Sequence, residues 1–273
     1  MHETMTSNRG HRYSIRVHQP QGQAPEEGHA LVWLLDAPTT WAPMQQALKE
    51  AGDSGVVVIG IDWEDDGEVD QNLRRRDFTR PARGDVPPPR GRTEAWTVDG
   101  DGDAFMHFLC ETLQPHYLAA LRVDARRQTL VGHSLSGLFV LQSLMTHPQR
   151  FGAYVAASPS IWWDGARIIE EAEGMDWTGA RGARALIGVG SHEQLAGPEK
   201  PPEVAGDDEA AVFAEPHMVS NASAFAELMQ SRGIDCHFRL FEGQAHHAVL
   251  PEAMAAALEF AHAPLGEWHQ RRR

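Results

Sequence analysis

The chain of 273 residues has only two cysteines, Cys110 and Cys236, which are too few for a disulfide framework at this length. We therefore expect both to be buried, reduced thiols. The sequence also lacks any apolar run near the roughly 20 residues of a membrane-spanning helix. Residues 1–12 lack the charged-then-apolar order of a secretory signal. These absences predict a cytoplasmic protein, although a periplasmic protein written without its signal would look the same.

Basic residues are scarce as well, since 24 Lys and Arg stand against 38 Asp and Glu and give a formal net charge of −14. This balance argues against binding to nucleic acid or to an anionic membrane surface. Histidines number 15, yet His192, His217 and His246 lack the tight spacing of metal ligands, and we find no zinc signature. We find no internal repeat and no low-complexity tract. We expect a single domain over residues 1–273 that needs no metal and no cofactor.

The sequence does contain a regular alternation of strand-like and helix-like segments. Apolar or alternating patterns predict strands at residues 13–17, 30–35, 55–61, 129–131, 154–157, 183–189 and 237–241. Helical spacing predicts helices at residues 41–51, 103–121, 135–147, 219–231 and 251–262. This alternation indicates an α/β protein with a mostly parallel, doubly wound sheet, in which ligands bind at the carboxyl ends of the strands.

Two segments break the alternation, namely residues 62–101 and 197–215. Both are rich in Gly, Pro and charged residues and have few apolar anchors. Long loops in compact domains are usually functional or disordered. We expect these two to be surface loops that form a loop-rich cap near the carboxyl ends of the strands.

Residues 132–137, Gly-His-Ser-Leu-Ser-Gly, lie between a predicted strand and a predicted helix. This context is typical of a nucleophile elbow, the tight turn that presents a catalytic serine. Such a turn needs small residues two positions before and after the serine, because bulk there would push strand and helix apart. Gly132 and Ser136 meet this need, and we interpret Ser136 as a packing residue. Ser134 is therefore the candidate nucleophile, and the competing interpretation is a turn without chemistry.

A serine nucleophile needs a base and an orienting acid, expected later in the chain in the order acid, then histidine. The turn after the strand at 237–241 supplies His246 or His247 as base. The turn after the strand at 183–189 places Glu193 where the acid belongs, with Asp207 and Asp208 as alternatives.

Attack on an acyl carbon also needs donors for the oxyanion that forms. We expect one donor to be the backbone N–H of Leu135, at the head of the elbow helix. The other is expected from the loop after Leu35, at Ala37. This expectation follows from the fold position alone, since backbone donors leave no mark in the sequence.

The residues carry a family resemblance over about positions 13–262. The matching segments are 34–36, 74–79, 132–141, 156–163 and 246–251, together with Phe151. In these segments the chain resembles the esterase D-like family of α/β-hydrolases. It is most similar to the branch of siderophore esterases that open trilactones such as enterobactin, salmochelin and bacillibactin.

The resemblance implies an α/β-hydrolase fold, with Ser134 as nucleophile and His246 as base, because His247 falls where the family usually has glycine. Glu193 falls where several members carry an acid, whereas some siderophore esterases work with a Ser-His dyad. The chain departs from the family pattern at Ala37, Arg80 and Ser136, where other members usually have glycine, proline and glycine.

An anionic substrate would need local positive charge in this acidic protein. We expect Arg74 or Arg76 to contact such a substrate, because a guanidinium binds catecholates and carboxylates well. The competing interpretation is a solvated loop, in which Asp77 pairs with one of these arginines. Trp162 and Trp163 follow a strand end near the elbow, and we expect one to stack on an aromatic acyl group and the other to be core.

The sequence thus predicts a serine esterase that forms an acyl-enzyme. The favoured substrate is a small-molecule ester, namely a catecholate siderophore or its ferric complex. The alternatives are a carboxylesterase or thioesterase for another small acyl substrate, and a non-catalytic binding module with the same fold. The oligomeric state leaves no signal in the sequence.

Overall fold

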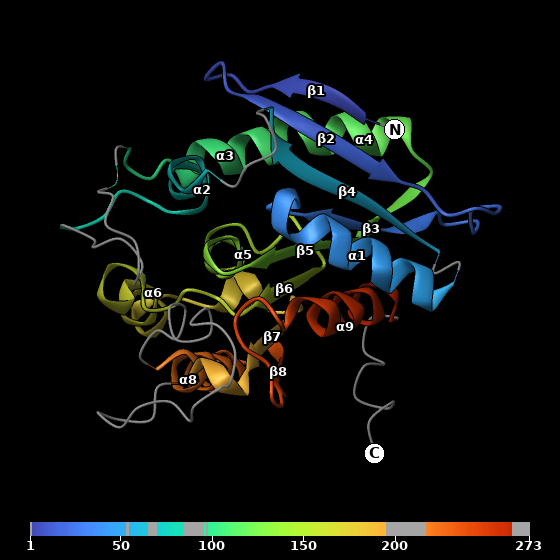
Figure 1. Cartoon of the computed structure of the whole chain (residues 1–273). Helices are drawn as coiled ribbons and strands as arrows, with labels where there is room; N and C mark the ends of the chain where they lie inside the picture. The colour runs from blue at the N-terminus through green and yellow to red at the C-terminus, as the bar shows by residue number, and fades with distance from the viewer. Residues whose placement is uncertain are drawn as a thin grey trace, which may run out of the picture.

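The computed structural model describes residues 2–52, 55–64, 70–84, 96, 98–194 and 217–263. Within them an eight-stranded sheet has the order β1-β2-β4-β3-β5-β6-β7-β8 (Figure 1). The strands are β1 (His2–Thr6), β2 (Arg12–His18), β3 (His29–Leu34), β4 (Val56–Trp63), β5 (Val123–His133), β6 (Ala153–Ala157), β7 (Arg184–Gly190) and β8 (Asp235–Phe241). Strands β1 and β2 pair antiparallel at one edge, and all pairs from β4 to β8 are parallel. The predicted, mostly parallel sheet is confirmed.

Helices cover both faces of this sheet. They are α1 (Ala37–Ala51), α2 (Gln71–Phe78), α3 (Gly102–Phe108), α4 (Gln114–Ala120), α5 (Leu135–Thr146), α6 (Trp163–Gly174), α8 (Met218–Ser231) and α9 (Leu250–His262), with a π-helical turn, η1 (Leu109–Leu113), between α3 and α4. Two 3₁₀ turns are η2 (Thr178–Ala180) and η3 (Ser191–Glu193). Helices α1 and α9 lie in front of the sheet in Figure 1 and cover one hydrophobic core. Helices α3, α5, α6 and α8 cover a second hydrophobic core on the other face of the sheet.

The strand sequences explain why there are two cores. Successive side chains of a strand point to opposite faces of the sheet. In β3, Leu31 and Trp33 join the core under α3, α5 and α8, whereas Val32 and Leu34 join the core under α1 and α9. All four are fully buried, as expected for a parallel strand covered on both faces.

Parts of the segment at 62–101 form regular secondary structure, so its assignment as one long loop was wrong. Asp62 and Trp63 complete β4, and α2 occupies residues 71–78. The side chain of Asp70 caps α2 by accepting hydrogen bonds from the N–H groups of Asn72 and Leu73. The run of charged residues hid this helix, because its buried polar side chains are held by ion pairs. Residues 65–69, 85–95 and 97 of the predicted cap, and all of 197–215, lie outside the described residues.

Helix α1 begins at Ala37, four residues before the position that the sequence suggested. Pro38 lies in its first turn, where a proline costs nothing because the amide has no partner within the helix. This start puts Ala37 at a helix N-terminus and not in a free loop. The difference matters for the site described below.

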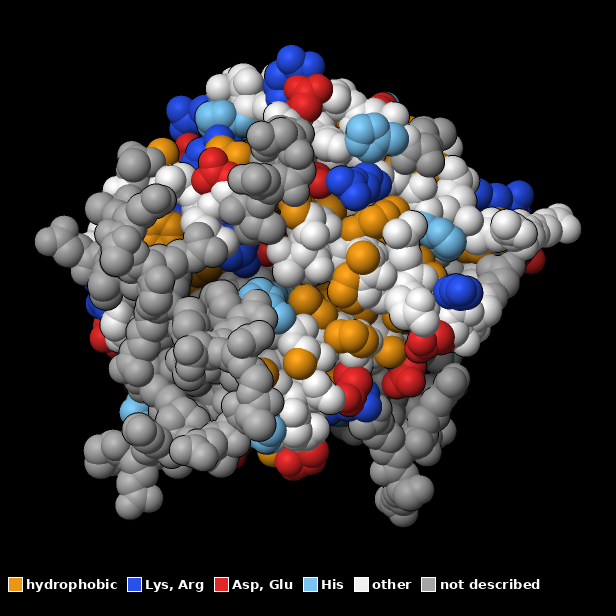
Figure 2. All heavy atoms as spheres, in the orientation of Figure 1, with side chains coloured by type: hydrophobic (Ala, Val, Ile, Leu, Met, Phe, Trp, Pro, Cys, Tyr) orange, Lys and Arg blue, Asp and Glu red, His pale blue; other side chains and the backbone are white. Residues whose placement is uncertain are grey.

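Both cysteines are buried and free, as expected. Burial raises the pKa of Cys110 to about 11 and that of Cys236 to about 12, so both stay protonated at neutral pH. On the face seen in Figure 2, acidic and basic side chains are intermingled, and neither charge dominates. In the part of the chain that the structure describes, every helix is too short or too polar to cross a bilayer.

Candidate active site

Ser134 lies in the turn between β5 and α5, where its backbone has φ 62° and ψ −119°. A residue with a side chain rarely adopts such a conformation, so the surrounding contacts must hold it there. Its N–H donates to the carbonyl of Ala157 at 3.0 Å, and its own carbonyl accepts from the N–H of Ser160 at 3.1 Å. These bonds fix the turn to the end of β6.

The small residues around Ser134 have the role that the elbow requires. A Cβ on Gly132 would lie 2.4 Å from the carbonyl oxygen of Ser136, so only glycine fits there. Ser136 is fully buried, and its hydroxyl accepts from the N–H of His133 and donates to the carbonyl of His133, both at 2.8 Å. The serine in place of the second glycine therefore closes the turn with two hydrogen bonds.

His246 and Glu193 meet at the same edge of the sheet. Nδ1 of His246 lies 2.6 Å from Oε2 of Glu193, and both side chains are buried. Because Nδ1 donates to the carboxylate, Nε2 of His246 carries the lone pair that can accept a proton. His247, the other candidate base, is exposed. The runners-up for the acid, Asp207 and Asp208, lie outside the described residues.

The carboxylate of Glu193 is held on its other oxygen. Oε1 accepts from the hydroxyl of Ser158 at 2.6 Å and from the N–H of Gly190 at 2.7 Å. These two donors fix the orientation of the carboxylate and aim Oε2 at His246. Ser158 follows β6, one strand from the elbow, so three strand ends build this contact.

Two helix N-termini face this edge, because β3 and β5 are neighbours. Leu34 pairs with Val131, and Ala37 and Ser134 each lie three residues beyond their member of that pair. The N–H groups of Ala37 and Leu135 are the first of α1 and α5, so neither has an acceptor within its helix. Both are therefore suited to bind an oxyanion near Ser134, and the oxyanion hole stays a prediction.

A second histidine, His133, lies next to His246. It is fully buried, and its ring centre lies 4.6 Å from that of His246 and 5.7 Å from that of His247. Burial lowers the pKa of His133 well below its usual value, and the neighbouring His246, His247 and Arg74 lower it further. His133 is therefore neutral at physiological pH.

Because His133 stays neutral in the folded protein, the stability of the fold should depend on pH. Below about pH 6.5 the histidine binds a proton in the unfolded chain but not in the folded protein. The free energy of unfolding should therefore fall as the pH drops below 6.5, by up to about 1.4 kcal/mol per pH unit for this residue. Denaturant unfolding between pH 7.5 and 5 should show a shallower loss in His133→Gln than in the natural protein. An unchanged slope would mean that His133 is charged in the folded state.

The arginines of the predicted anion-binding run are all paired with carboxylates. Their partners are Asp36 for Arg74, Asp99 for Arg75, Asp77 for Arg76, Glu171 for Arg80, and Asp164 and Glu170 for Arg83. Asp77 also accepts from Tyr13 and Trp63, beside β2 and β4. The structural pairing that the sequence analysis offered as the alternative is thus present for Asp77 and Arg76.

Arg74 is paired with a carboxylate that lies next to the predicted oxyanion donor Ala37. Its Nε and Nη2 atoms lie 2.9 Å and 2.8 Å from Oδ2 of Asp36, the fully buried residue directly before Ala37. Asp36 has φ 61°, so the turn into α1 is strained and needs external support. The ion pair supplies this support and thereby fixes the position of the Ala37 N–H.

We predict that Arg74→Gln lowers kcat for a neutral p-nitrophenyl ester and for an anionic siderophore by similar factors. Breaking a buried ion pair costs about 3–5 kcal/mol, so the melting temperature should fall as well. The exposed, ion-paired Arg83 offers a matched control, and Arg83→Gln should change little. A rise in KM for the anionic substrate alone would instead make Arg74 a substrate contact, as the sequence analysis expected.

The two tryptophans differ in their surroundings. Trp163 is buried, and its ring lies 5.6 Å from that of Trp96 and 5.5 Å from the guanidinium of Arg75. Trp162 is only partly buried, and it lies two residues after Ser160, whose Oγ is 3.3 Å from Oγ of Ser134. The structure therefore makes Trp163 core and leaves part of Trp162 exposed, two residues from the Ser160 that contacts Ser134.

Sequence reasoning missed several residues of the site: His133, Ser158, Ser160 and the Asp36–Arg74 pair. Their position relative to the strands could have indicated them, because each of these residues except Arg74 lies at or just after the end of a strand. Their partners are distant in sequence, so no local pattern indicated the contacts.

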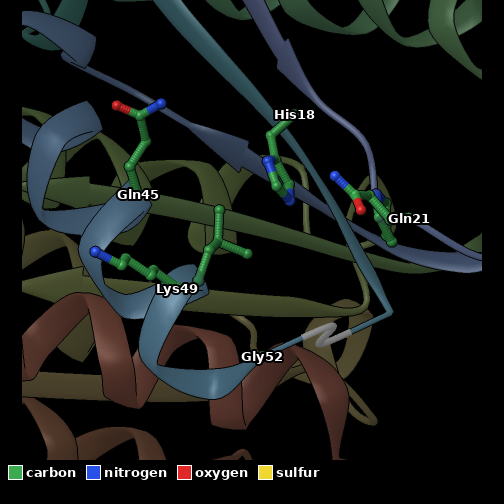
Figure 3. Close-up of a pocket in the computed structure, with 7 residues that line it drawn as sticks. His18, Gln21, Gln45, Lys49 and Gly52 are labelled. Atoms are coloured by element: carbon green, nitrogen blue, oxygen red, sulfur yellow. The ribbon is translucent and has the colours of Figure 1, made fainter.

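A separate cleft of about 380 Å³ lies between the last turns of α1 and the end of β2 (Figure 3). It is lined by His18, Pro20, Gln21, Gln45, Leu48, Lys49 and Gly52. At 1.5 Å per residue, Lys49 is about 18 Å along α1 from Ala37, so this cleft is not the site around Ser134. Among the described residues, no cluster of His, Cys, Asp and Glu has the arrangement of a metal site.

The sheet topology, together with a nucleophile elbow at the carboxyl end of β5, defines an α/β-hydrolase. The chain matches the model of the family described as "Putative esterase" over residues 6–261, and it belongs to this family. It is 31% identical to the ferri-bacillibactin esterase BesA of Bacillus subtilis over 272 residues, which cover 95% of this chain and 88% of BesA. It is 33% identical to a siderophore enterobactin esterase of Emericella nidulans over 59% of this chain and 57% of that protein.

Solved structures show the same similarity. The BES protein from Bacillus cereus superposes with a TM-score of 0.78 at 25% identity, covering 96% of this chain and 95% of that one. The siderophore hydrolase EstA from Aspergillus nidulans gives a TM-score of 0.77 at 26% identity, covering 96% and 93%. The protein is thus an enzyme that hydrolyses ester bonds, and the alternative of a non-catalytic binding module is not supported.

Proposed function

We propose that this esterase works through a serine acyl-enzyme, with Ser134 as nucleophile, His246 as base and Glu193 as orienting acid. The observation that carries the proposal is the 2.6 Å contact of Nδ1 of His246 with Glu193 at the edge of the sheet where Ser134 emerges. The chain order serine, acid, histidine is that of α/β-hydrolases. A full triad therefore has more support than a Ser-His dyad.

In this mechanism Oγ of Ser134 attacks the ester carbonyl while Nε2 of His246 takes the hydroxyl proton. Glu193 stabilises the imidazolium that forms, and the N–H groups of Leu135 and Ala37 bind the oxyanion of the tetrahedral intermediate. The intermediate collapses to the acyl-enzyme, and His246 returns the proton to the leaving alkoxide. A water molecule, deprotonated by His246, then attacks the acyl group. The bond to Oγ of Ser134 breaks, the carboxylic acid leaves, and His246 returns the proton to Oγ.

We further propose that the substrate is a catecholate siderophore or its ferric complex. BesA and the enterobactin esterase of Emericella nidulans, by their names, act on siderophores, and BesA matches along nearly the whole chain. Trp162 is suited to stack on an aromatic acyl group, since it is partly exposed two residues from Ser160. In this proposal Trp162 contacts the substrate and Trp163 supports it from the core.

One observation favours a second candidate, a carboxylesterase or thioesterase for a neutral acyl substrate. Each arginine from Arg74 to Arg83 already has a carboxylate partner, which offsets its charge. An anionic ferric catecholate would gain less from such paired arginines than from unpaired ones. The two candidates share the same chemistry and differ in the charge of the substrate.

The two candidates are separated by measuring kcat/KM for a catecholate trilactone, free and iron-loaded, against p-nitrophenyl acetate and an acyl thioester. Products are followed by liquid chromatography, and Ser134→Ala serves as the control for background hydrolysis. We expect the trilactone to be the best substrate, with cleavage to its linear form. A kcat/KM for the trilactone below that of p-nitrophenyl acetate would favour the second candidate.

A further inference from the structure

His133 has a contact with the base itself. Its Nε2 lies 2.8 Å from the backbone carbonyl oxygen of His246. A carbonyl can only accept a hydrogen bond, so Nε2 of His133 carries the proton and donates. Nδ1 of the neutral ring then carries the lone pair, and this buried atom has no hydrogen-bond partner among the residues that the structure describes.

This arrangement is costly for the fold alone. A buried acceptor without a partner costs about 1–3 kcal/mol relative to a satisfied one. An aliphatic side chain at this fully buried position would avoid that cost. Among the described residues, the ring makes a single hydrogen bond, the one to the carbonyl of His246. That bond is therefore the interaction that could offset the cost.

We propose that His133 is a positioning residue for the reaction, which ties the backbone of the base to the nucleophile elbow. The inference rests on the proposed roles of Ser134 and His246. His133 is covalently joined to Ser134, and Ser136 holds its N–H and carbonyl at 2.8 Å each. Any shift of the turn that carries His246 away from the elbow must therefore break the bond at Nε2.

The hydrogen bond from His133 to the carbonyl of His246 complements the contact between His246 and Glu193. Glu193 holds the ring of His246 at Nδ1, and His133 holds its carbonyl, so both ends of the residue are anchored. Together they fix the orientation of the His246 ring, on which the proposed proton transfer from Ser134 depends. A displacement of about 1 Å between reacting groups can lower a rate by about 100-fold, so this anchoring affects turnover directly.

The neutrality of His133 serves the same purpose. The groups that face its ring are His246, His247 and Arg74. A charged His133 would repel the imidazolium that His246 forms during the reaction. Its burial keeps it neutral, so it donates a hydrogen bond to the base without adding a positive charge beside it.

The test compares His133→Gln with His133→Leu and His133→Asn, using p-nitrophenyl acetate. The amide nitrogen of glutamine reaches about as far as Nε2 and can donate, whereas asparagine reaches only to the place of Nδ1 and leucine has no donor. We expect the Leu and Asn variants to lose about 100-fold in kcat with little change in KM, and Gln to stay within about fivefold of the natural protein. His147→Gln, at the far end of α5, is the matched control and should be unaffected.

Two results would overturn the proposal. One is a Gln variant as inactive as the Asn variant when both melt within a few degrees of the natural protein. The other is a pH profile of kcat/KM whose acidic limb moves up by about one unit in His133→Gln, which would show that a positive charge had been removed. If the Leu variant does not fold, the comparison of Gln with Asn decides. Activity that survives in Ser134→Ala would contradict the proposed function instead, so the two failures are distinguishable.

Discussion

Replacing Ser134 with alanine is expected to abolish ester hydrolysis, lowering kcat by about 10⁵-fold or more, because the oxygen that forms the acyl-enzyme is lost. The fold should be retained, since the side chain contributes one 3.3 Å contact with Ser160 and little packing. Steady-state kinetics with p-nitrophenyl acetate measures the activity, and thermal unfolding measures the fold. Incubation with a fluorophosphonate should add one adduct per chain to the natural protein and none to the variant.

Ser143 provides the matched control for this experiment. It lies in the helix that follows Ser134, is more buried than Ser134, and its hydroxyl donates to the carbonyl of Phe139 at 2.7 Å. Ser143→Ala should keep kcat within a few-fold of the natural protein. If Ser134→Ala retains more than trace activity while it resists the fluorophosphonate, another residue is the nucleophile.

Replacing His246 with alanine is expected to lower kcat by about 10³-fold or more, as loss of a catalytic base typically does. Without the imidazole nothing takes the proton of Ser134, and the buried carboxylate of Glu193 loses its contact. The melting temperature should fall as well, because a buried carboxylate is then left with only Ser158 and Gly190 as donors. The measurement is kcat for p-nitrophenyl acetate beside a thermal unfolding curve.

His247→Ala is the natural comparison, because the two histidines are adjacent and only His246 is buried against Glu193. Its loss should cost less than about tenfold in kcat. If His247→Ala is instead the more damaging change, the base is His247 and not His246.

The fold was predictable because local patterns and tertiary packing agree along most of the chain. The buried strands at Val56–Trp63 and Arg184–Gly190 are apolar along most of their length, a pattern typical of strands covered on both faces. The pattern failed at α2, where Arg74 and Asp77 are buried although their residue types indicate the surface. Their burial depends on partners far away in sequence, Asp36 and Tyr13 among them.

The residues of the candidate site also fall into two groups: those that a local sequence pattern indicates and those that only the tertiary structure reveals. The elbow around Ser134 is a local signal, since a small residue, a serine and a helix start are all contiguous. The choice between His246 and His247 needed the structure or the resemblance, because both lie in one polar turn. The surroundings of Glu193 needed the structure alone, because Ser158 and Gly190 come from two different strand ends.

By itself, the sequence determined the α/β alternation, the serine at the elbow and the chain order of serine, acid and histidine. These features depend on periodicity and on residues that are neighbours along the chain. Only the tertiary structure decided that Arg74 binds Asp36, that Trp163 is core, and that His133 holds the carbonyl of His246. The physical reason is that parallel strands bring residues more than a hundred positions apart to one edge of the sheet. There burial and hydrogen bonding, and not the local pattern, determine what each side chain can do.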